Sequence, residues 1–146
     1  MKIFVGSAAG AKSQAKAFIN ANTKWGVKFL PWWDAFQPGR VLIDELKRIK
    51  YEVDAAILII SPDVKAKIKS HYQYIPNLNV LLEFGYFYAA FGKKKVAIVK
   101  YGNVSLPSDL GGYIHIAGST HFTHNGIVQP GRKTKDNFAS WIKAMK

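Results

Sequence analysis

The chain has 146 residues, no cysteine and a formal net charge of +12. A length of about 150 residues is typical of one domain. The lack of cysteine excludes disulfides, thiolate metal sites and cysteine nucleophiles, and it fits a reducing compartment. Lysine and arginine are spread over many segments, so we expect a surface that attracts small anionic partners and do not expect a nucleic-acid binder.

The first half of the chain predicts two strands and two helices. The β-rich run Lys2–Gly6 predicts a strand, and the Ala, Gln and Lys content of Ala11–Ala21 favours a helix. Val27–Trp32 predicts the second strand, followed by a turn-rich stretch, Trp33–Gly39. A helix is expected over Arg40–Lys50 because its apolar residues recur at helical spacing.

The second half begins with Asp54–Ser61, whose continuous apolar run is typical of a parallel strand covered on both faces. Residues 65–76 alternate lysine with aromatic residues and predict an exposed, mobile connection. An apolar helix is expected over Leu78–Gly92, with Asn77 or Asn79 as its N-cap. The remaining predicted elements are strands at Lys95–Tyr101 and Tyr113–Ala117, a loop at 118–131, and a closing helix at Lys135–Met145.

The alternation of strands and helices predicts an α/β fold with right-handed crossovers and helices on both faces of a parallel sheet. With five strands we expect a flavodoxin-like, three-layer arrangement in the order 2-1-3-4-5. Ligands in that fold bind beyond the carboxyl ends of strands 1 and 3. We expect residues 1–146 to form this single domain.

Glu83 is the only charged residue in the apolar run Leu78–Gly92. Burying an unpaired carboxylate costs on the order of several kcal/mol. Glu83 is therefore either a structural carboxylate satisfied by donors or a catalytic group with a shifted pKa. Asn79 lies one helical turn earlier on the same face, so the two side chains are candidates to hold a ribose together.

Small and aromatic residues follow the first two predicted strands. Gly6 and Ser7 open a short loop before a helix, which suits either a phosphate or a tight strand-to-helix turn. The loop has neither Walker nor dinucleotide spacing. Trp32 and Trp33 cannot both point inward from an extended strand end. Either one of them lines a cleft as a stacking surface, or both cap the edge of the core.

Five segments carry a further signal through their order along the chain. They are Ile3–Ser7, Trp33–Gly39, Ala56–Asp63, Asn79–Gly85 and Leu106–Leu110. Together they resemble a TIR-like family of predicted nucleotide-binding proteins, the TIR domain of bacterial CBASS and Pycsar antiphage effectors, including TIR–STING fusions. The fourth segment matches the family's NVxxExG motif. The resemblance spans about residues 3–117 and leaves the loop and closing helix at 118–146 unmatched.

The resemblance implies an NAD+ glycohydrolase that cleaves the nicotinamide–ribose bond to give nicotinamide and ADP-ribose. NAD is then the substrate, and neither a cofactor nor a metal is expected. The glutamate of NVxxExG, here Glu83, is implied to be catalytic. The first two loops are implied to bind the dinucleotide, which carries this role to Gly6, Ser7, Trp33, Phe36 and Arg40.

Two other functions remain compatible with these residues. One is a nucleoside deoxyribosyltransferase-like enzyme, in which a glutamate on a comparable helix is the nucleophile. The other is a non-catalytic TIR interaction module, in which Glu83 is structural and the basic faces dock partners.

The resemblance also implies that activity needs assembly into a homo-oligomer or filament. Family members often continue into a STING-type cyclic-dinucleotide sensor, and we expect this chain to end before one. The amino terminus runs directly into a predicted strand, which predicts a cytoplasmic protein without a signal peptide. No membrane segment is expected, because the apolar runs are shorter than about 18 residues.

Overall fold

The computed structural model describes residues 1–107, 114–122 and 128–146. Parts of two segments named above, Leu106–Leu110 and Tyr113–Ala117, lie outside the described residues. The main sheet is parallel, with strand order β2-β1-β3-β6-β7. Its strands are β1 (Lys2–Ser7), β2 (Lys28–Pro31), β3 (Ala55–Ile60), β6 (Val96–Lys100) and β7 (Ile114–Ala117). Numbered among themselves, these strands have the predicted order 2-1-3-4-5, so the flavodoxin-like fold is confirmed.

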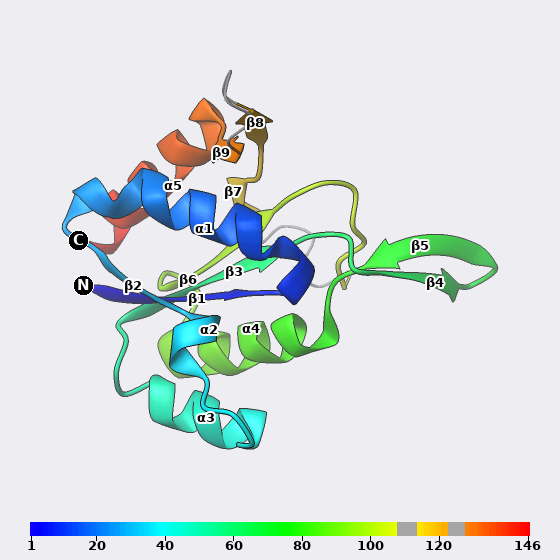
Figure 1. Ribbon diagram of the computed structural model, residues 1–146, viewed down its shortest axis with the longest axis horizontal. Coiled ribbons are helices and arrows are strands. Elements are labelled where there is room, and N and C mark those ends of the chain that lie inside the picture. The colour runs from blue at the N-terminus through cyan, green and yellow to red at the C-terminus, as the bar shows by residue number, and fades with distance from the viewer. Residues whose placement is uncertain (108–113, 123–127) are drawn as a thin grey trace.

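Helices cover both faces of the sheet, as Figure 1 shows. They are α1 (Lys12–Asn22), α2 (Trp32–Ala35), α3 (Leu42–Ile49), α4 (Leu78–Phe91) and α5 (Arg132–Met145), with short 3-10 turns at Ala9–Ala11 and Thr23–Trp25. Because successive strand residues point to opposite faces, β3 divides its side chains between two cores. Ile57 and Ile59 pack towards α1 and α5, whereas Leu58 and Ile60 pack towards α3 and α4.

Most element bounds agree with the prediction to within a few residues, and the N-cap of α4 is settled as Asn77. Its side-chain Oδ1 accepts hydrogen bonds from the backbone N–H groups of Asn79, at 2.9 Å, and Val80, at 3.3 Å. These bonds satisfy two of the unpaired N–H groups that open any helix. Asn79 therefore lies in the first turn of α4, with its side chain exposed.

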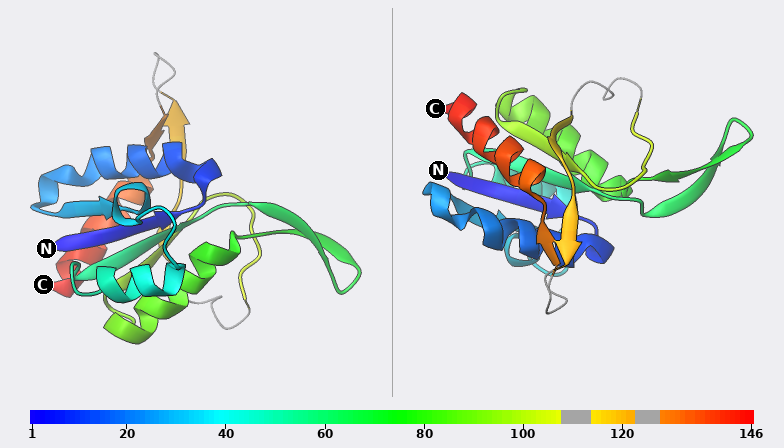
Figure 2. Two further views of the ribbon diagram at one scale, coloured as in Figure 1. Left: turned by 60° about the horizontal axis from the view of Figure 1, so that its bottom comes forward. Right: turned by 90° about the horizontal axis from the view of Figure 1, so that it is seen from above.

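The connection predicted at residues 65–76 is a β-hairpin rather than an irregular segment. Strands β4 (Val64–Ile68) and β5 (His71–Ile75) pair antiparallel, and the hairpin projects from the body of the domain, as Figures 1 and 2 show. Lys69 and Ser70 at its tip have φ values of 49° and 69°. Two consecutive positive φ values match the primed turns that suit the twist of a two-residue hairpin. The local turn chemistry was missed because neither residue is Gly or Asn.

The loop predicted at 118–131 also contains regular structure. Strands β8 (Thr120–Phe122) and β9 (Val128–Pro130) pair antiparallel, and α5 starts three residues earlier than predicted, at Arg132. Thr134 ties the helix to the strand end, because its hydroxyl donates to Ala117 O at 2.6 Å and accepts from Ser119 N–H at 2.9 Å.

Candidate active site

Glu83 lies on the buried side of α4, which faces the carboxyl ends of β1 and β3. Its side chain is 3% exposed, and its helix neighbours Val80, Phe84 and Phe87 are buried with it. Among the described residues, its Oε2 atom has no hydrogen-bond partner. The buried carboxylate predicted from the sequence is therefore present, and its Oε2 lacks the donor that a purely structural role requires.

Burial raises the pKa of Glu83 from 4.5 to about 8. The cause is desolvation, which disfavours the ionised form of a carboxyl group in an apolar setting. A carboxyl group with a pKa near neutrality can exchange a proton under physiological conditions, and perturbed groups of this kind are concentrated at functional sites.

Gly6 forms the wall against which the Glu83 carboxylate lies. A methyl group at Gly6 would overlap Glu83 Oε2 and would lie 2.7 Å from Leu58 Cδ1 and 3.1 Å from Phe4 Cε1. Glycine is thus required because two elements approach each other closely here. Gly6 and Ser7 belong to β1, not to a flexible loop, so the predicted loop begins later than expected.

Ser7 and Trp32 connect the end of β1 to the start of α2. The Trp32 indole Nε1–H donates to Ser7 Oγ at 2.9 Å, and the buried Ser7 hydroxyl donates to Ala8 O at 3.0 Å. Ser7 thereby positions the indole.

The paired tryptophans begin a short helix instead of ending a strand, and both are half-buried. Trp32 packs against the core on the α4 side of the sheet, and Trp33 packs against the core on the α1 side. Of the two arrangements expected from the sequence, the structure therefore has the one in which both tryptophans cap the edge of the core. The Lys12 ammonium lies 5.8 Å from the Trp32 ring centroid and 5.1 Å from that of Trp33, a cation–π contact that the sequence analysis missed.

The other predicted site residues divide into two groups. Phe36 is half-buried beside Phe4, with ring centroids 5.7 Å apart, in the same core that encloses Glu83. Arg40 and Asn79 have exposed side chains. Among the described residues, neither side chain makes a hydrogen bond to Glu83, and the charge of Arg40 contributes to lowering the pKa of Glu45 on α3.

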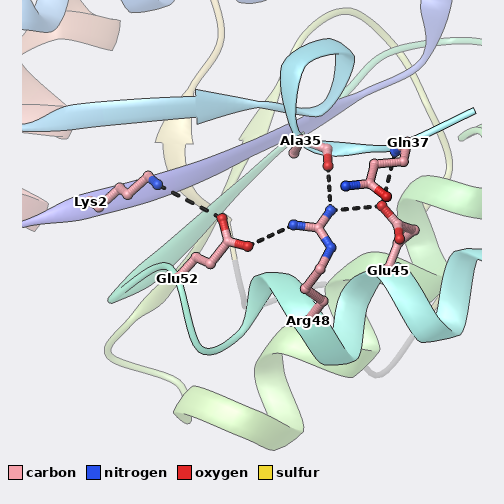
Figure 3. A network of polar contacts seen from close by, with 6 residues as sticks. All are labelled: Lys2, Ala35, Gln37, Glu45, Arg48 and Glu52. Atoms are coloured by element: carbon pink, nitrogen blue, oxygen red, sulfur yellow. Dashed lines mark hydrogen bonds and ion pairs between the residues drawn. The ribbon is translucent and has the colours of Figure 1, made fainter.

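An ion-pair network holds the segment after α2 against α3, as Figure 3 shows. Arg48 Nη2 donates to Ala35 O at 2.6 Å and to Glu45 Oε2 at 2.7 Å, and Arg48 Nη1 donates to Glu52 Oε1 at 2.6 Å. The backbone N–H of Gln37 also donates to Glu45 Oε2, at 2.9 Å. This network fixes the loop that carries Phe36. The sequence analysis did not predict it, although Glu45 and Arg48 are three residues apart on one helix, a spacing typical of an ion pair.

A hollow of about 540 Å³ lies at the carboxyl edge of the sheet. Its lining includes Gln14, Ser61, Asp63 and Tyr101. Tyr101 belongs to the core on the α1 and α5 face, and burial raises its pKa to about 12. Glu83 belongs to the opposite face of the sheet and does not line this hollow. No group of three or more His, Cys, Asp or Glu side chains suited to a metal occurs among the described residues.

A family model matches most of the chain. The family model that matches is described as "CAP12/Pycsar effector protein, TIR domain", and it covers residues 2–119. The chain belongs to this TIR family. The matched region includes every predicted site residue and ends close to the expected boundary at residue 117.

Three curated relatives of this TIR domain share parts of its sequence. Protein tirC of Dictyostelium discoideum is 38% identical over 90 residues, covering 53% of this chain and 45% of that protein. CD-NTase-associated protein 12 of Sphingobacterium faecium is 34% identical over 86 residues, covering 59% of this chain and 27% of that protein. The uncharacterized protein YuaY of Escherichia coli is 30% identical over 84 residues, covering 56% of this chain and 28% of that protein. The matched part of this TIR domain thus corresponds to less than half of each relative.

The helices in the described part of this TIR domain are all too short or too polar to cross a membrane.

Proposed function

We propose that this TIR domain is an NAD+ glycohydrolase that releases nicotinamide and ADP-ribose, and that it acts as the effector of an antiphage defence system. The observation that carries the proposal is the Glu83 carboxylate. It is buried against Gly6 near the carboxyl end of β1, and its Oε2 has no hydrogen-bond partner among the described residues. The resemblance of the NVxxExG segment to NAD-cleaving TIR domains supports the same assignment.

The reaction breaks the bond between ribose C1′ and the nicotinamide nitrogen. The bonding electron pair goes to that nitrogen, so the pyridinium becomes neutral nicotinamide and leaves without needing a proton. Glu83 stabilises the positive charge that develops on the ribose in the oxocarbenium-like transition state. A water molecule then adds to C1′ and loses a proton to the carboxylate. One carboxylate is sufficient because the leaving group needs no second acid.

The ionised form of Glu83 is the reactive one in this mechanism. Burial holds its pKa at about 8, and the positive charge of a bound nicotinamide ring counteracts that effect by favouring the carboxylate. The free domain should therefore show a kcat/KM that increases as pH rises towards about 8.

Residues of the first two loops and of α4 provide the remaining parts of the site. Phe36 lies in the core that encloses Glu83 and offers an aromatic surface for a base of the dinucleotide, whereas Trp33 packs on the opposite face of the sheet. Ser7 acts by placing the indole of Trp32. We assign the exposed Arg40 and Asn79 side chains to the phosphates and the ribose hydroxyls of NAD.

Assembly completes the site. Because Glu83 is 3% exposed, NAD reaches it only after the residues that cover it move. We expect a homo-oligomer or filament to hold the open arrangement, with a STING-type cyclic-dinucleotide sensor as the triggering module.

The test is release of nicotinamide from NAD by the concentrated or artificially clustered domain, measured by chromatography. Glu83→Gln should lower turnover by about 10²- to 10⁴-fold. Asp136→Asn is a control that also removes one carboxylate, from a side chain on α5 that is 70% exposed and pairs with Arg132; it should retain wild-type turnover. A folded Glu83→Gln variant with wild-type turnover would refute the proposal.

Two further outcomes distinguish the alternatives. Transfer of deoxyribose from a deoxynucleoside to a free base, without NAD cleavage, would indicate a deoxyribosyltransferase. Self-association that persists in Glu83→Ala, with no nicotinamide released by any assembled form, would indicate an interaction module.

A further inference from the structure

The projecting β4–β5 hairpin has the composition of a surface that binds a polyanion. Residues 64–75 contain three lysines and a histidine but no aspartate or glutamate. The hairpin is joined to the body near its base, where Asp63 N–H donates to Ile75 O at 3.1 Å and Ser105 N–H donates to Tyr74 O at 2.9 Å. Most of its side chains are exposed.

The strand register gathers cations and aromatic rings on one face of the hairpin. Lys65 pairs with Tyr74, and Lys67 pairs with Tyr72. Directly opposite residues of an antiparallel pair share a face, and residues two apart on a strand share it as well. All four side chains are exposed, with Tyr72 at 67% and Tyr74 at 50%. We call these four residues the Lys–Tyr face.

Within this face, the lysine ammonium groups lie close to a tyrosine ring. The Lys65 ammonium lies 5.4 Å from the Tyr72 ring centroid, and that of Lys67 lies 6.0 Å from it. Lys65 and Lys67 are two residues apart, or about 6.7 Å along an extended strand, which is close to the separation of neighbouring phosphates along a nucleic-acid strand. The two lysines are therefore placed to contact neighbouring phosphates.

A small hollow continues this face onto the body of the domain. It has a volume of about 160 Å³ and is lined by Lys65, Tyr72, Gln73, Tyr74, Asn103 and Ser105. An ammonium, phenols, amides and a hydroxyl surround it, which are donors suited to a phosphate or a base edge.

The chemistry of the Lys–Tyr face favours a nucleic acid over an acidic protein segment. An acidic peptide would use the two lysines but would have no use for two exposed rings beside them. Single-stranded nucleic acid uses both, because phosphates pair with lysine and bases stack on aromatic side chains. The same face of a second copy is disfavoured as the occupant, because its two lysines would repel Lys65 and Lys67.

We propose that the Lys–Tyr face of the β4–β5 hairpin binds single-stranded nucleic acid. Lys65 and Lys67 contact phosphates, and Tyr72 and Tyr74 stack with bases. The binding is independent of base sequence and depends on salt. The charge distribution read from the sequence did not predict it, because only the register places the two lysines and the two tyrosines together.

The test measures fluorescence anisotropy of a labelled oligo-dT 12-mer with the whole chain at 50 to 200 mM salt. The double variant Lys65→Gln/Lys67→Gln should weaken binding at least about tenfold and reduce the salt slope by about 1.4, since each single-strand phosphate contact contributes about 0.7. The matched control is Lys133→Gln/Lys143→Gln, which removes the same charge from two exposed positions on α5. That control should retain the wild-type slope.

A second pair of variants tests whether a tyrosine ring of this face stacks with a base. Tyr72→Leu should weaken binding by about 5- to 150-fold, which is the range for loss of one stacked base. Tyr51→Leu is the control, because Tyr51 is 83% exposed and also lies under a lysine, with the Lys50 ammonium 4.9 Å from its ring centroid. It should leave binding unchanged.

Three results would overturn the proposal. The first is no binding by the wild-type chain at 50 mM salt. The second is equal weakening by the two lysine pairs or by the two tyrosine variants, which would indicate attraction by net charge alone. The third is displacement of the oligonucleotide by polyglutamate of the same charge as readily as by unlabelled oligo-dT, which would indicate a surface for acidic proteins.

Discussion

The pH dependence of stability should separate the two buried glutamates, Glu83 and Glu45. Both are 3% exposed. Desolvation raises the pKa of Glu83 to about 8, whereas the hydrogen bond from Arg48, followed by the one from Gln37 N–H, lowers the pKa of Glu45. Two side chains of one type and equal exposure therefore respond to pH in opposite directions.

The size of the Glu83 contribution to the free energy of unfolding follows from the pKa values of this group in the folded and unfolded chain. A carboxyl group whose pKa is higher in the folded than in the unfolded chain contributes stability that is fully present below the unfolded value. That stability is lost as pH rises through the folded value. The interval from 4.5 to about 8 corresponds to at most about 5 kcal/mol, at about 1.36 kcal/mol per pH unit.

The perturbation is Glu83→Gln, which keeps the shape of the side chain and removes its ionisation. Relative to this variant, the wild-type free energy of unfolding should fall steadily between about pH 4.5 and pH 8 and level off above. The slope is the quantity to compare, because a buried glutamine amide has its own constant desolvation cost.

The assay is urea unfolding followed by tryptophan fluorescence at a series of pH values from about 3 to 9, with Glu45→Gln alongside. The folded pKa of Glu45 is lowered, so its contribution is present above the unfolded value of 4.5 and lost as pH falls further. The wild type should accordingly lose stability relative to Glu45→Gln only on the acidic side. Parallel curves for the wild type and Glu83→Gln between pH 5 and 8 would mean that the Glu83 carboxylate is solvated or paired, and the reasoning about a dry carboxyl group would be refuted.

Three further predictions concern Gly6, the hairpin turn and Arg48. Gly6→Ala should destabilise the domain by about 1–3 kcal/mol in urea unfolding, because the new methyl overlaps Glu83 Oε2; an unchanged midpoint would contradict the close approach. Ser70→Gly should slow amide hydrogen exchange in the β4–β5 hairpin by up to about fivefold, since a φ of 69° costs an L-residue about 1 kcal/mol; faster exchange would disprove the turn. Arg48→Met should lower Tm well below the value for Arg132→Met, whose ion pair is exposed, and equal Tm values would show that the network adds no stability.

Patterns within short stretches of sequence were sufficient to predict the main elements and their order. The continuous apolar run of β3, the helical stripe of α3 and the Asn77 cap of α4 are local signals, and alternation of strands and helices leaves few topologies for a parallel sheet. The lone charge in the apolar run also identified Glu83 correctly as a buried carboxylate.

The hairpins show where local patterns were insufficient. Val64–Ile68 alternates apolar residues with lysine, as a strand does, but the stretch is short and most of its side chains are exposed, so we interpreted it as a connection without regular structure. Lys69 and Ser70 form the turn of the β4–β5 hairpin at positive φ values. Glycine or asparagine usually occupies such positions, so the sequence carried no recognisable turn signal there. The pair Trp32 and Trp33 was misplaced on a strand end because a four-residue helix is too short to show a period.

The sequence by itself determined the layers of this TIR domain, the strand order and the presence of one carboxylate in an apolar helix, because these depend on residue types a few positions apart. The tertiary structure decided what surrounds that carboxylate. Gly6 meets Glu83, Trp32 bonds to Ser7, and the Lys–Tyr face forms across a hairpin register. Each of these contacts joins residues on different helices or strands. It therefore forms only when the chain has folded and brought those elements together.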